Sequence, residues 1–511
     1  MRRRTNSDAT GPRPPQNLRA PNTYRPTLQA IGVENLSLTK SSTMFAFSCR
    51  SVYSTIVCLL WLLSSLEILA MSARMPTLSS MARTDSARET LSNNTVNAIK
   101  FEVSNRAHGS IRDAPFYTVS ENTANAQPGT LLKLEKETNT TLYTMPPGLA
   151  MSRFIYQSRT SNGTIIPVSA YILWPYTAIP YDGGLPVVVW AHGTSGISAQ
   201  CAPSNIRNLW HHFQVPYQLA LAGYVVVATD YAGLGVEKDA HGEFIVHEYL
   251  TGPAQANDVM YSIPAAREAF PELSKEFVII GSSEGGGAVW GVAQKFASKP
   301  MAGFLGTVAL SPVTRVLALP TDEAILGLLV VMMIPGIESN FPGFNRADIL
   351  EPKGLQTLNT YLDLQGCNTV LFQLPAGLDI LKPNWRENPH VQQWQELAAN
   401  GGKAIGGPML IIQGAMDPIV HAQTTTDAVN ETARMFPMAH IEYNLLPNIT
   451  HGPAMHAGQR LYMEWIAERF AQRPTKPGLQ EYVAMPVRPA SALQPETNFF
   501  LALETEPWQA T

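Results

Sequence analysis

The residues that most clearly suggest chemistry lie in the segment Gly281-Ser282-Ser283-Glu284-Gly285. An apolar run at 277–280 precedes this segment, and a stretch rich in glycine and alanine follows it. Between a strand and a helix, a Gly-x-Ser-x-Gly segment forms a sharp turn that pushes the serine hydroxyl clear of the sheet. The pattern predicts Ser283 as a nucleophile, with Gly281 and Gly285 as the glycines that the turn requires. The alternative is a glycine-rich turn with an idle serine.

A serine hydroxyl is a weak nucleophile, so Ser283 needs a base and an acid that orients the base. Where the serine comes first along the chain, the acid follows it and the histidine comes last. Asp417 follows the apolar run at 409–413, in a Gly-Ala-Met-Asp-Pro turn. An acid just past the carboxyl end of a strand could reach a histidine, and we therefore predict Asp417 as the acid. The alternative is that Asp417 only shapes an Asp-Pro turn.

Three histidines lie near the last apolar run, at 441–446. His451 lies in the loop that leaves this run, where the base is expected, whereas His440 precedes the run and lies at its wrong end. His456 is the competing candidate and lies a little further along the chain. We predict that His451 takes the proton from Ser283 and later gives it to the leaving group.

The tetrahedral intermediate of such a reaction carries an oxyanion, which needs hydrogen-bond donors. One donor is expected to be the backbone N–H of Glu284, the residue after the nucleophile. The second should come from the loop after the apolar run at 186–191, where we predict the N–H of Thr194. His192, in the same loop, is expected to support it rather than to react. Asp230 precedes the nucleophile in the chain and is expected to be structural.

The N-terminal segment indicates secretion. Residues 51–66 carry no charge, and the run is shorter than the roughly 20 residues that a membrane-spanning helix needs. It fits the apolar region of a signal peptide, with a small-x-small cleavage site at Ala70-Met71-Ser72. We predict a signal peptide at 44–73, after a disordered or non-native extension at 1–43. A membrane anchor through residues 51–70 is the alternative.

The cysteines agree with secretion. Cys49 and Cys58 lie in the N-terminal part, which leaves Cys201 and Cys367 as an isolated pair. Such a pair suits a single disulfide in an oxidising compartment, and two buried thiols are the alternative. Glycosylation sequons agree with secretion as well. The candidate acceptors are Asn93, Asn139, Asn162, Asn430 and Asn448.

The charge balance bears on partners. The chain is 15% charged and 45% hydrophobic, and its net charge is −4 without a long basic run. Nucleic acid is therefore not an expected partner. The chemistry outlined above needs only side chains and backbone groups, so no cofactor and no metal ion is expected.

Apolar, β-branched runs alternate with helical stretches from residue 165 onward. This alternation predicts an α/β fold with a mainly parallel sheet and helices on both faces. The predicted strands are 186–191, 224–229, 277–280, 304–310, 409–413 and 441–446, and the predicted helices are 211–223, 254–270 (with a possible kink at Pro264) and 287–297. Residues 74–104 are expected to be a linker, 105–470 the main domain and 471–511 a C-terminal extension.

Residues 312–407 interrupt this alternation and are expected to form a cap over the strand ends. They contain an apolar stretch at 324–334, which is too short to span a membrane. Two interpretations stay open for it: a buried cap helix without a role in binding, or a hydrophobic lid that meets the substrate.

The motifs together resemble a known family. Trp190-Ala-His-Gly-Thr-Ser-Gly196, Cys201-Ala-Pro-Ser204 and Ala228-Thr-Asp-Tyr-Ala-Gly-Leu-Gly235 are similar to segments of the secretory lipase family, the lipase A type of the α/β-hydrolase superfamily. Gly281–Gly287, Gly414–Pro418 and Thr450–Pro453 continue the similarity in the same order, which covers roughly residues 147–470.

The resemblance implies an α/β-hydrolase fold with an inserted cap and ester substrates. It implies Ser283, Asp417 and His451 as the triad, and a disulfide from Cys201 to a cysteine of the cap. Two features depart from the family. Glu284 stands where the lipase A type has glycine, and cysteines for the family's second, C-terminal disulfide are absent.

These observations predict a secreted serine ester hydrolase, a lipase or carboxylesterase that acts through an acyl-enzyme. Its partner would be a small-molecule or lipid ester, with transient contact to a lipid interface through the cap. One alternative is an amidase or aminopeptidase in which Glu284 or acids of the cap bind a substrate amine. A deacylase of secondary metabolites and a non-catalytic binding protein on the same fold are further alternatives.

Overall fold

The computed structural model describes residues 91–211, 215–319 and 324–494. The predicted extension at 1–43, the signal peptide at 44–73 and the alternative anchor at 51–70 lie outside the described residues. Within the described part of the chain, no helix is both long and apolar enough to cross a membrane.

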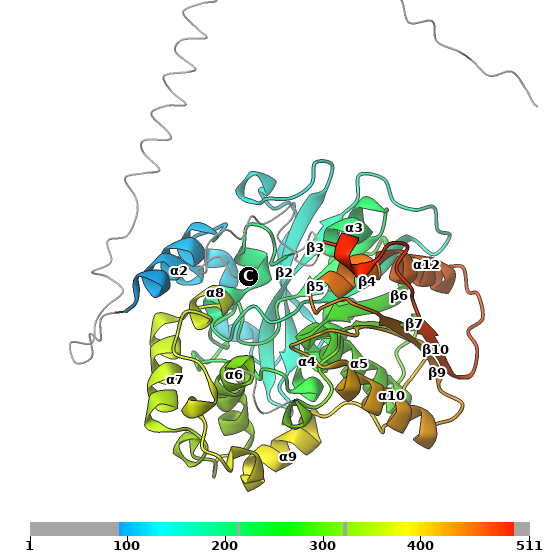
Figure 1. Ribbon diagram of the computed structural model, residues 1–511. Helices are drawn as coiled ribbons and strands as arrows, with labels where there is room; N and C mark the ends of the chain where they lie inside the picture. Colours follow the sequence, from blue (N-terminus) through cyan, green and yellow to red (C-terminus); the bar gives the residue numbers. More distant parts are fainter. Residues whose placement is uncertain (1–90, 212–214, 320–323, 495–511) are drawn as a thin grey trace, which may run out of the picture. The chain divides into compact units, whose positions relative to one another are not determined.

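The described residues build one ten-stranded sheet in the order β1-β2-β3-β5-β4-β6-β7-β8-β9-β10 (Figure 1). The first three strands and their junction with β5 are antiparallel, and every neighbouring pair from β5 to β10 is parallel. The strands are β1 (Leu131–Glu135), β2 (Ala150–Arg159), β3 (Ile165–Trp174), β4 (Leu185–Ala191), β5 (Val225–Thr229), β6 (Leu273–Ser282), β7 (Phe304–Leu310), β8 (Met409–Gly414), β9 (His440–Leu446) and β10 (Gly478–Val483).

The central strands are apolar along their whole length because both faces of the sheet are covered. On one face, α4 (Gly252–Ala269), α5 (Glu284–Ser298) and α10 (Ala422–Met435) pack over the sheet. On the other face lie α3 (Pro216–Leu221) and α12 (Gln459–Phe470). Consecutive strand residues therefore enter two different cores: Val187 and Val189 face the first layer, and Val188 and Trp190 the second. The predicted α/β fold with a mainly parallel sheet is confirmed.

The insertion between β7 and β8 has its own helices and its own hydrophobic core. Its helices are α6 (Ala324–Asn340), α7 (Pro352–Leu364), α8 (Asn368–Leu371) and α9 (Pro389–Ala398). In α6, side chains from Leu326 to Ile337 are buried around the whole helix, as expected of a helix that is apolar on all sides.

Several elements differ from their prediction. The last part of the predicted linker at 74–104 is a helix, α2 (Asn93–Ser104). Ser92 caps its start, because the Ser92 hydroxyl accepts a hydrogen bond from the N–H of Thr95. The predicted C-terminal extension contains β10, which extends the sheet beyond β9. Pro264 lies inside α4 without interrupting it, since Gly252–Ala269 is one continuous helix.

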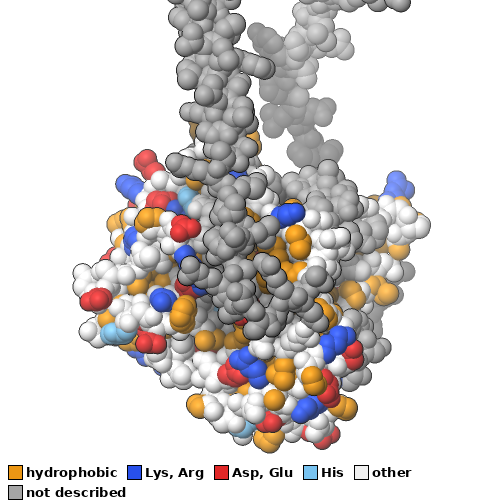
Figure 2. Space-filling view, turned by 90° about the vertical axis from the view of Figure 1, so that its left-hand side faces the viewer, with side chains coloured by type: hydrophobic (Ala, Val, Ile, Leu, Met, Phe, Trp, Pro, Cys, Tyr) orange, Lys and Arg blue, Asp and Glu red, His pale blue; other side chains and the backbone are white. Residues whose placement is uncertain are grey.

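The surface on the side of α2 and α7 carries charges of both signs. Figure 2 shows basic and acidic side chains interspersed with hydrophobic ones on this face. No extended field of one sign stands out among the described residues that this view shows.

Candidate active site

Ser283 lies on a strained turn between β6 and α5. Its backbone angles are φ 57° and ψ −118°, a conformation that L-residues rarely adopt. The turn is possible only because its flanks are glycine: a Cβ at Gly281 would overlap the carbonyl oxygen of Gly285, and a Cβ at Gly285 would overlap that of Ala191. The local geometry is therefore that of a nucleophile elbow.

Backbone hydrogen bonds hold this turn in place. The N–H of Ser283 donates to the carbonyl of Leu310 at 2.9 Å, at the end of β7. The Ser283 carbonyl accepts from the N–H groups of Gly287, at 3.0 Å, and Val313, at 3.1 Å. Three hydrogen bonds, from the first turn of α5 and from the segment 310–313, thus fix the orientation of the serine.

Asp417 and His451 meet at the carboxyl ends of β8 and β9. The Nδ1 atom of His451 lies 2.7 Å from Oδ2 of Asp417. Because a carboxylate only accepts, Nδ1 carries the proton, and Nε2 of the neutral ring is left free to act as a base. The Asp417 side chain is fully buried, and that of His451 is 15% exposed.

The surroundings of Asp417 favour its charged form. Its Oδ1 accepts from the N–H groups of Ile419, at 2.9 Å, and Val420, at 2.8 Å, while Gln413 Nε2 donates to Oδ2 at 3.1 Å. Burial by itself raises the pKa of the Asp417 carboxyl, but His451 and the two N–H groups outweigh burial and hold this pKa below its usual value. Asp417 is thus an ionised acceptor for the His451 ring.

The other histidines near β9 are placed differently. His456 lies in the short helix α11 (Pro453–Ala457), and burial lowers its pKa. His440 stands at the start of β9, where its Nδ1 lies 2.6 Å from Oγ1 of Thr475. The histidine that meets Asp417 is therefore His451.

Ser283 and His451 line one cavity of about 270 Å³. Thr194 also lines it, as does the apolar face of α6. The apolar lining comes from Trp190, Trp210, Leu250, Val313, Leu319, Ile325, Leu328, Leu329, Met332, Leu371, Phe372, Ile419, Val420 and Met455. Helix α6, which contains the 324–334 stretch, is thus both buried and a wall of this cavity.

The loop after β4 brings Thr194 next to the elbow. The Oγ1 atom of Thr194 lies 2.8 Å from the hydroxyl of Tyr249, which anchors its side chain. Glu284 is the first residue of α5, and the first N–H groups of a helix have no carbonyl partner within the helix. A Cβ at Gly193 would lie 3.5 Å from the Ser283 Cβ, so this loop and the elbow are in close approach.

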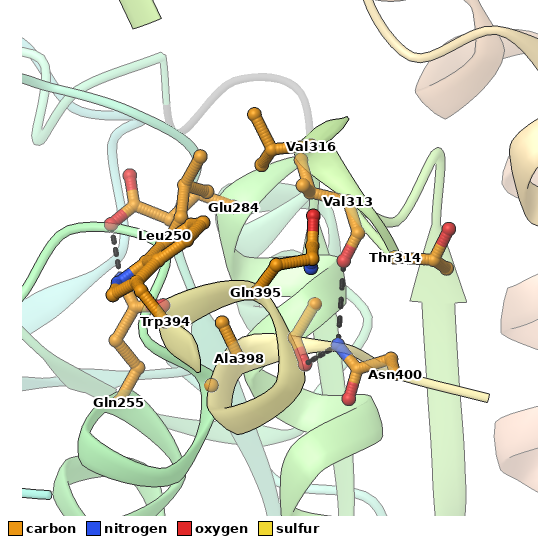
Figure 3. Close-up of a pocket in the computed structure, with 12 residues that line it drawn as sticks. Leu250, Gln255, Glu284, Val313, Thr314, Val316, Trp394, Gln395, Ala398 and Asn400 are labelled. Carbon is orange, nitrogen blue, oxygen red and sulfur yellow. Dashed lines mark hydrogen bonds between the residues drawn. The ribbon is translucent and has the colours of Figure 1, made fainter. Parts of the chain in front are cut away.

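The Glu284 side chain turns away from this cavity. It is 1% exposed, accepts a hydrogen bond from Gln255 Nε2 and lies 3.1 Å from Nε2 of His247. Figure 3 shows it beside Gln255 at a separate, nearly filled void of about 10 Å³ that Trp394 and Asn400 also line. In this arrangement the Glu284 carboxylate does not face the cavity that holds Ser283.

Glu284 and His247 form a buried ion pair. Both ring nitrogens of His247 face oxygens, since Nδ1 lies 2.9 Å from the carbonyl of Ala232. Burial lowers the pKa of His247, but the hydrogen bond and the charge of Glu284 outweigh burial and raise it. The first turn of α5 is also a favourable place for a carboxylate, because the helix dipole is positive there.

His192 and Asp230 have structural surroundings. The ring nitrogens of His192 lie 2.7 Å from the Gly193 carbonyl and 3.2 Å from the Asp230 carbonyl. Asp230 is buried and accepts hydrogen bonds from Ser169 and from the N–H and hydroxyl of Ser204. Burial raises the pKa of Asp230 to about 6.

The structure contains a disulfide between Cys201 and Cys367, which joins the segment after the loop at 193–196 to the insertion. The backbones also pair there, as Gly196 forms a β-bridge with Cys367. Gly196 has φ +140°, and a Cβ on it would lie 2.7 Å from the Cys201 sulfur. The insertion is thus attached at the edge of the cavity by a covalent bond and by backbone pairing.

All five sequon asparagines are exposed. They are Asn93, Asn139, Asn162, Asn430 and Asn448.

Some residues of the site had not been singled out from the sequence. Gln413 supports Asp417, Tyr249 anchors Thr194, and His247 pairs with Glu284. A signal existed for Gln413, which is the one amide in the apolar run of β8 and lies directly before the turn that carries Asp417. Tyr249 and His247 lie in an irregular segment with no pattern that would mark them.

The fold and the elbow define the class of structure: this chain has the α/β-hydrolase fold. No family model and no curated protein sequence matches it. Among solved structures it is similar to lipase A of Candida antarctica in its closed state, with a TM-score of 0.59 and 16% identity over 72% of this chain and 87% of that chain. It is also similar to the rice cell wall degrading esterase LipA of Xanthomonas oryzae, with a TM-score of 0.52 and 15% identity over 68% of this chain and 98% of that chain. The expected resemblance to lipase A is thus confirmed at the level of the fold.

Proposed function

We propose that this protein is a serine ester hydrolase in which Ser283, His451 and Asp417 form the triad. One observation carries the proposal: a buried Asp417 holds His451 at 2.7 Å, and His451 lines the same cavity as a serine on a strained elbow. The backbone of the elbow is strained, and strain of this kind is typical of functional sites. In a nucleophile elbow the strained turn exposes the serine hydroxyl. The names of the structural neighbours, a lipase and an esterase, support the same class of reaction.

The proposed reaction has two halves. His451 Nε2 takes the proton of the Ser283 hydroxyl as the oxygen attacks the ester carbonyl, and the backbone N–H groups of Thr194 and Glu284 stabilise the oxyanion. His451 then protonates the leaving alcohol, which leaves an acyl group on Ser283. Water, activated by the same ring, hydrolyses this acyl-enzyme and restores the serine.

The cavity favours a neutral, apolar acyl group. Among the described residues that line it, there is no lysine, arginine, aspartate or glutamate. A substrate amine would need a carboxylate partner in such a desolvated site, and the Glu284 carboxylate is paired with His247 and Gln255 instead. We therefore place an ester with an apolar acyl chain ahead of an aminopeptidase substrate. We propose that transient contact with a lipid interface is made through the cap, the insertion that contains α6.

The test is covalent labelling of Ser283. A fluorophosphonate should label the purified protein on this residue, as mapped by peptide mass spectrometry. Ser283→Ala should lower turnover of a chromogenic ester by on the order of 10⁴-fold or more, and Ser282→Ala, at the neighbouring serine, should retain most of it. Label on another serine of an active enzyme would overturn the assignment. Rates over a series of acyl chain lengths, with an amino-acid anilide as comparison, would define the substrate class.

A further inference from the structure

The short helix α8 of the insertion is hydrogen-bonded directly to the loop that carries Thr194. The N–H of Asn368 donates to the carbonyl of Ser195 at 3.0 Å, and its Nδ2 donates to the carbonyl of Thr194 at 2.9 Å. Asn368 is only 8% exposed, so solvent competes little for these bonds. One residue of the insertion thereby holds two successive carbonyls of the loop.

These two bonds restrict the backbone on both sides of Ser195. A peptide unit is planar, so the bond at the Thr194 carbonyl fixes the unit that joins residues 194 and 195. The N–H of Thr194 belongs to the preceding unit, whose Gly193 carbonyl accepts a hydrogen bond from Trp210 Nε1 at 3.1 Å. With the Thr194 side chain anchored on Tyr249 at 2.8 Å, the remaining freedom of residue 194 is small. Asn368 therefore holds the carbonyl side of Thr194, and with it the Cα atom next to the proposed oxyanion donor, the Thr194 N–H.

Helix α8 is held in turn by α2, which precedes the first strand of the sheet in the sequence. Glu102 of α2 accepts hydrogen bonds from the N–H groups of Cys367, at 2.9 Å, and Val370, at 2.8 Å. The Thr95 hydroxyl of the same helix donates to the carbonyl of Gln373 at 3.0 Å. A continuous set of contacts thus runs from α2 through α8 to the loop at 193–196.

We propose that Asn368 is a positioning residue for the oxyanion donor Thr194, and that Glu102 positions Asn368. The inference rests on the function proposed above and extends it to two residues outside the triad, of which Asn368 also lines the cavity. Oxyanion donors act only when they lie about 2.7–3.1 Å from the developing charge, and a displacement of about 1 Å can cost on the order of 10²-fold in rate. A residue that holds the donor residue in place should therefore affect turnover more than substrate binding.

The experiment separates positioning from folding. Asn368→Ala removes the bond to Thr194 but keeps the backbone bond to Ser195. Glu102→Gln keeps one acceptor and turns an N–H group toward the other donor. We expect each variant to lower kcat by about tenfold to a hundredfold, with KM changed by less than about threefold. Lys100→Gln, on an exposed position of α2, is the matched control and should behave as the parent.

Inhibitors give the decisive readout. A trifluoromethyl ketone forms a tetrahedral adduct with the serine and places an oxyanion between the donors, whereas an alkyl ether of equal length does not. Asn368→Ala should weaken the ketone by the same factor as kcat and leave the ether unchanged. Equal loss of affinity for both inhibitors, or an unchanged kcat, would overturn the positioning role. If Ser283→Ala kept full activity, the proposed function itself would fail, which is a different result.

Discussion

At the scale of single residues, the choice of the base follows from a contact that the sequence could only suggest. The spacing after β9 predicts His451 and leaves His456 as a competitor. The structure places His451 against Asp417 and His456 in α11. The ionised Asp417 carboxylate thus orients His451, and His456 lies five positions further along the chain in α11.

This difference predicts the outcome of two substitutions. His451→Ala should abolish measurable ester turnover, because no group remains to take the serine proton. His456→Ala should leave a substantial fraction of the parent's rate. Initial rates of both purified variants, at matched protein folding judged by circular dichroism, check the assignment, and the reverse ranking would move the base to His456. The parent should also lose activity in acid, since a protonated ring cannot accept a proton.

The role of the Glu284 carboxylate could not be predicted from the sequence pattern. Its position after the nucleophile predicts a role for its N–H, and its charge leaves open a role for its carboxylate in substrate binding. The partner that decides the second question is His247, which comes from a segment without regular structure. Only the fold brings that segment against α5, and no local pattern reports such a contact.

At the scale of elements, the predicted strands are the ones with continuous apolar, β-branched runs. The predicted range 304–310 coincides with β7 (Phe304–Leu310), and the runs that became β4, β6, β8 and β9 are accurate to within a few residues at their ends. Strand β10 was not predicted, since its Gly-Leu-Gln-Glu-Tyr-Val sequence lacks a buried face. Helix α2 was not predicted because polar residues dominate its first turn. Its hydrogen bonds to the insertion come from the buried Thr95 and the half-buried Glu102. Burial raises the pKa of Glu102 to about 7.

The disulfide between Cys201 and Cys367 carries a prediction at this scale. It spans 166 residues of sequence, and in the chain-entropy model such a loop contributes roughly 5 kcal/mol to the free energy of unfolding. Replacing both cysteines by serine should lower the melting temperature and the rate, because the insertion carries Asn368 beside Cys367. Differential scanning calorimetry and ester turnover measure the two effects. Non-reducing peptide mapping of the parent should show the two cysteine peptides linked, and two free, alkylatable thiols would contradict the bridge.

At the scale of the whole molecule, we propose that the protein is secreted and glycosylated. The five sequon asparagines are spread over the described sequence from residue 93 to 448, and each is exposed. An enzyme that transfers glycans in the secretory pathway could therefore reach all of them in the folded chain. The predicted signal peptide at 44–73 supplies the route.

Glycan release from secreted protein checks this proposal. After expression in a eukaryotic host, an amidase that removes N-linked glycans should lower the apparent mass of the protein in the medium. Asn448→Gln, which removes one sequon, should give a smaller loss than the parent shows. Protein that stays inside the cell, or whose mass the treatment leaves unchanged, would contradict secretion with glycosylation.

Strand β10 has a consequence for how copies of this chain meet. Without it, β9 would be the outer strand of the sheet and would offer a row of open N–H and C=O groups to any second molecule. Residues 478–483 close that row by parallel pairing with residues 440–445, and Glu481 then places a charge on the new outer strand. A chain cut after Phe470, where the resemblance to lipases ends, would keep every residue of the proposed triad and lose this cover. Such a fragment should self-associate through its exposed strand, so we expect residues 478–483 to matter for solubility rather than for chemistry.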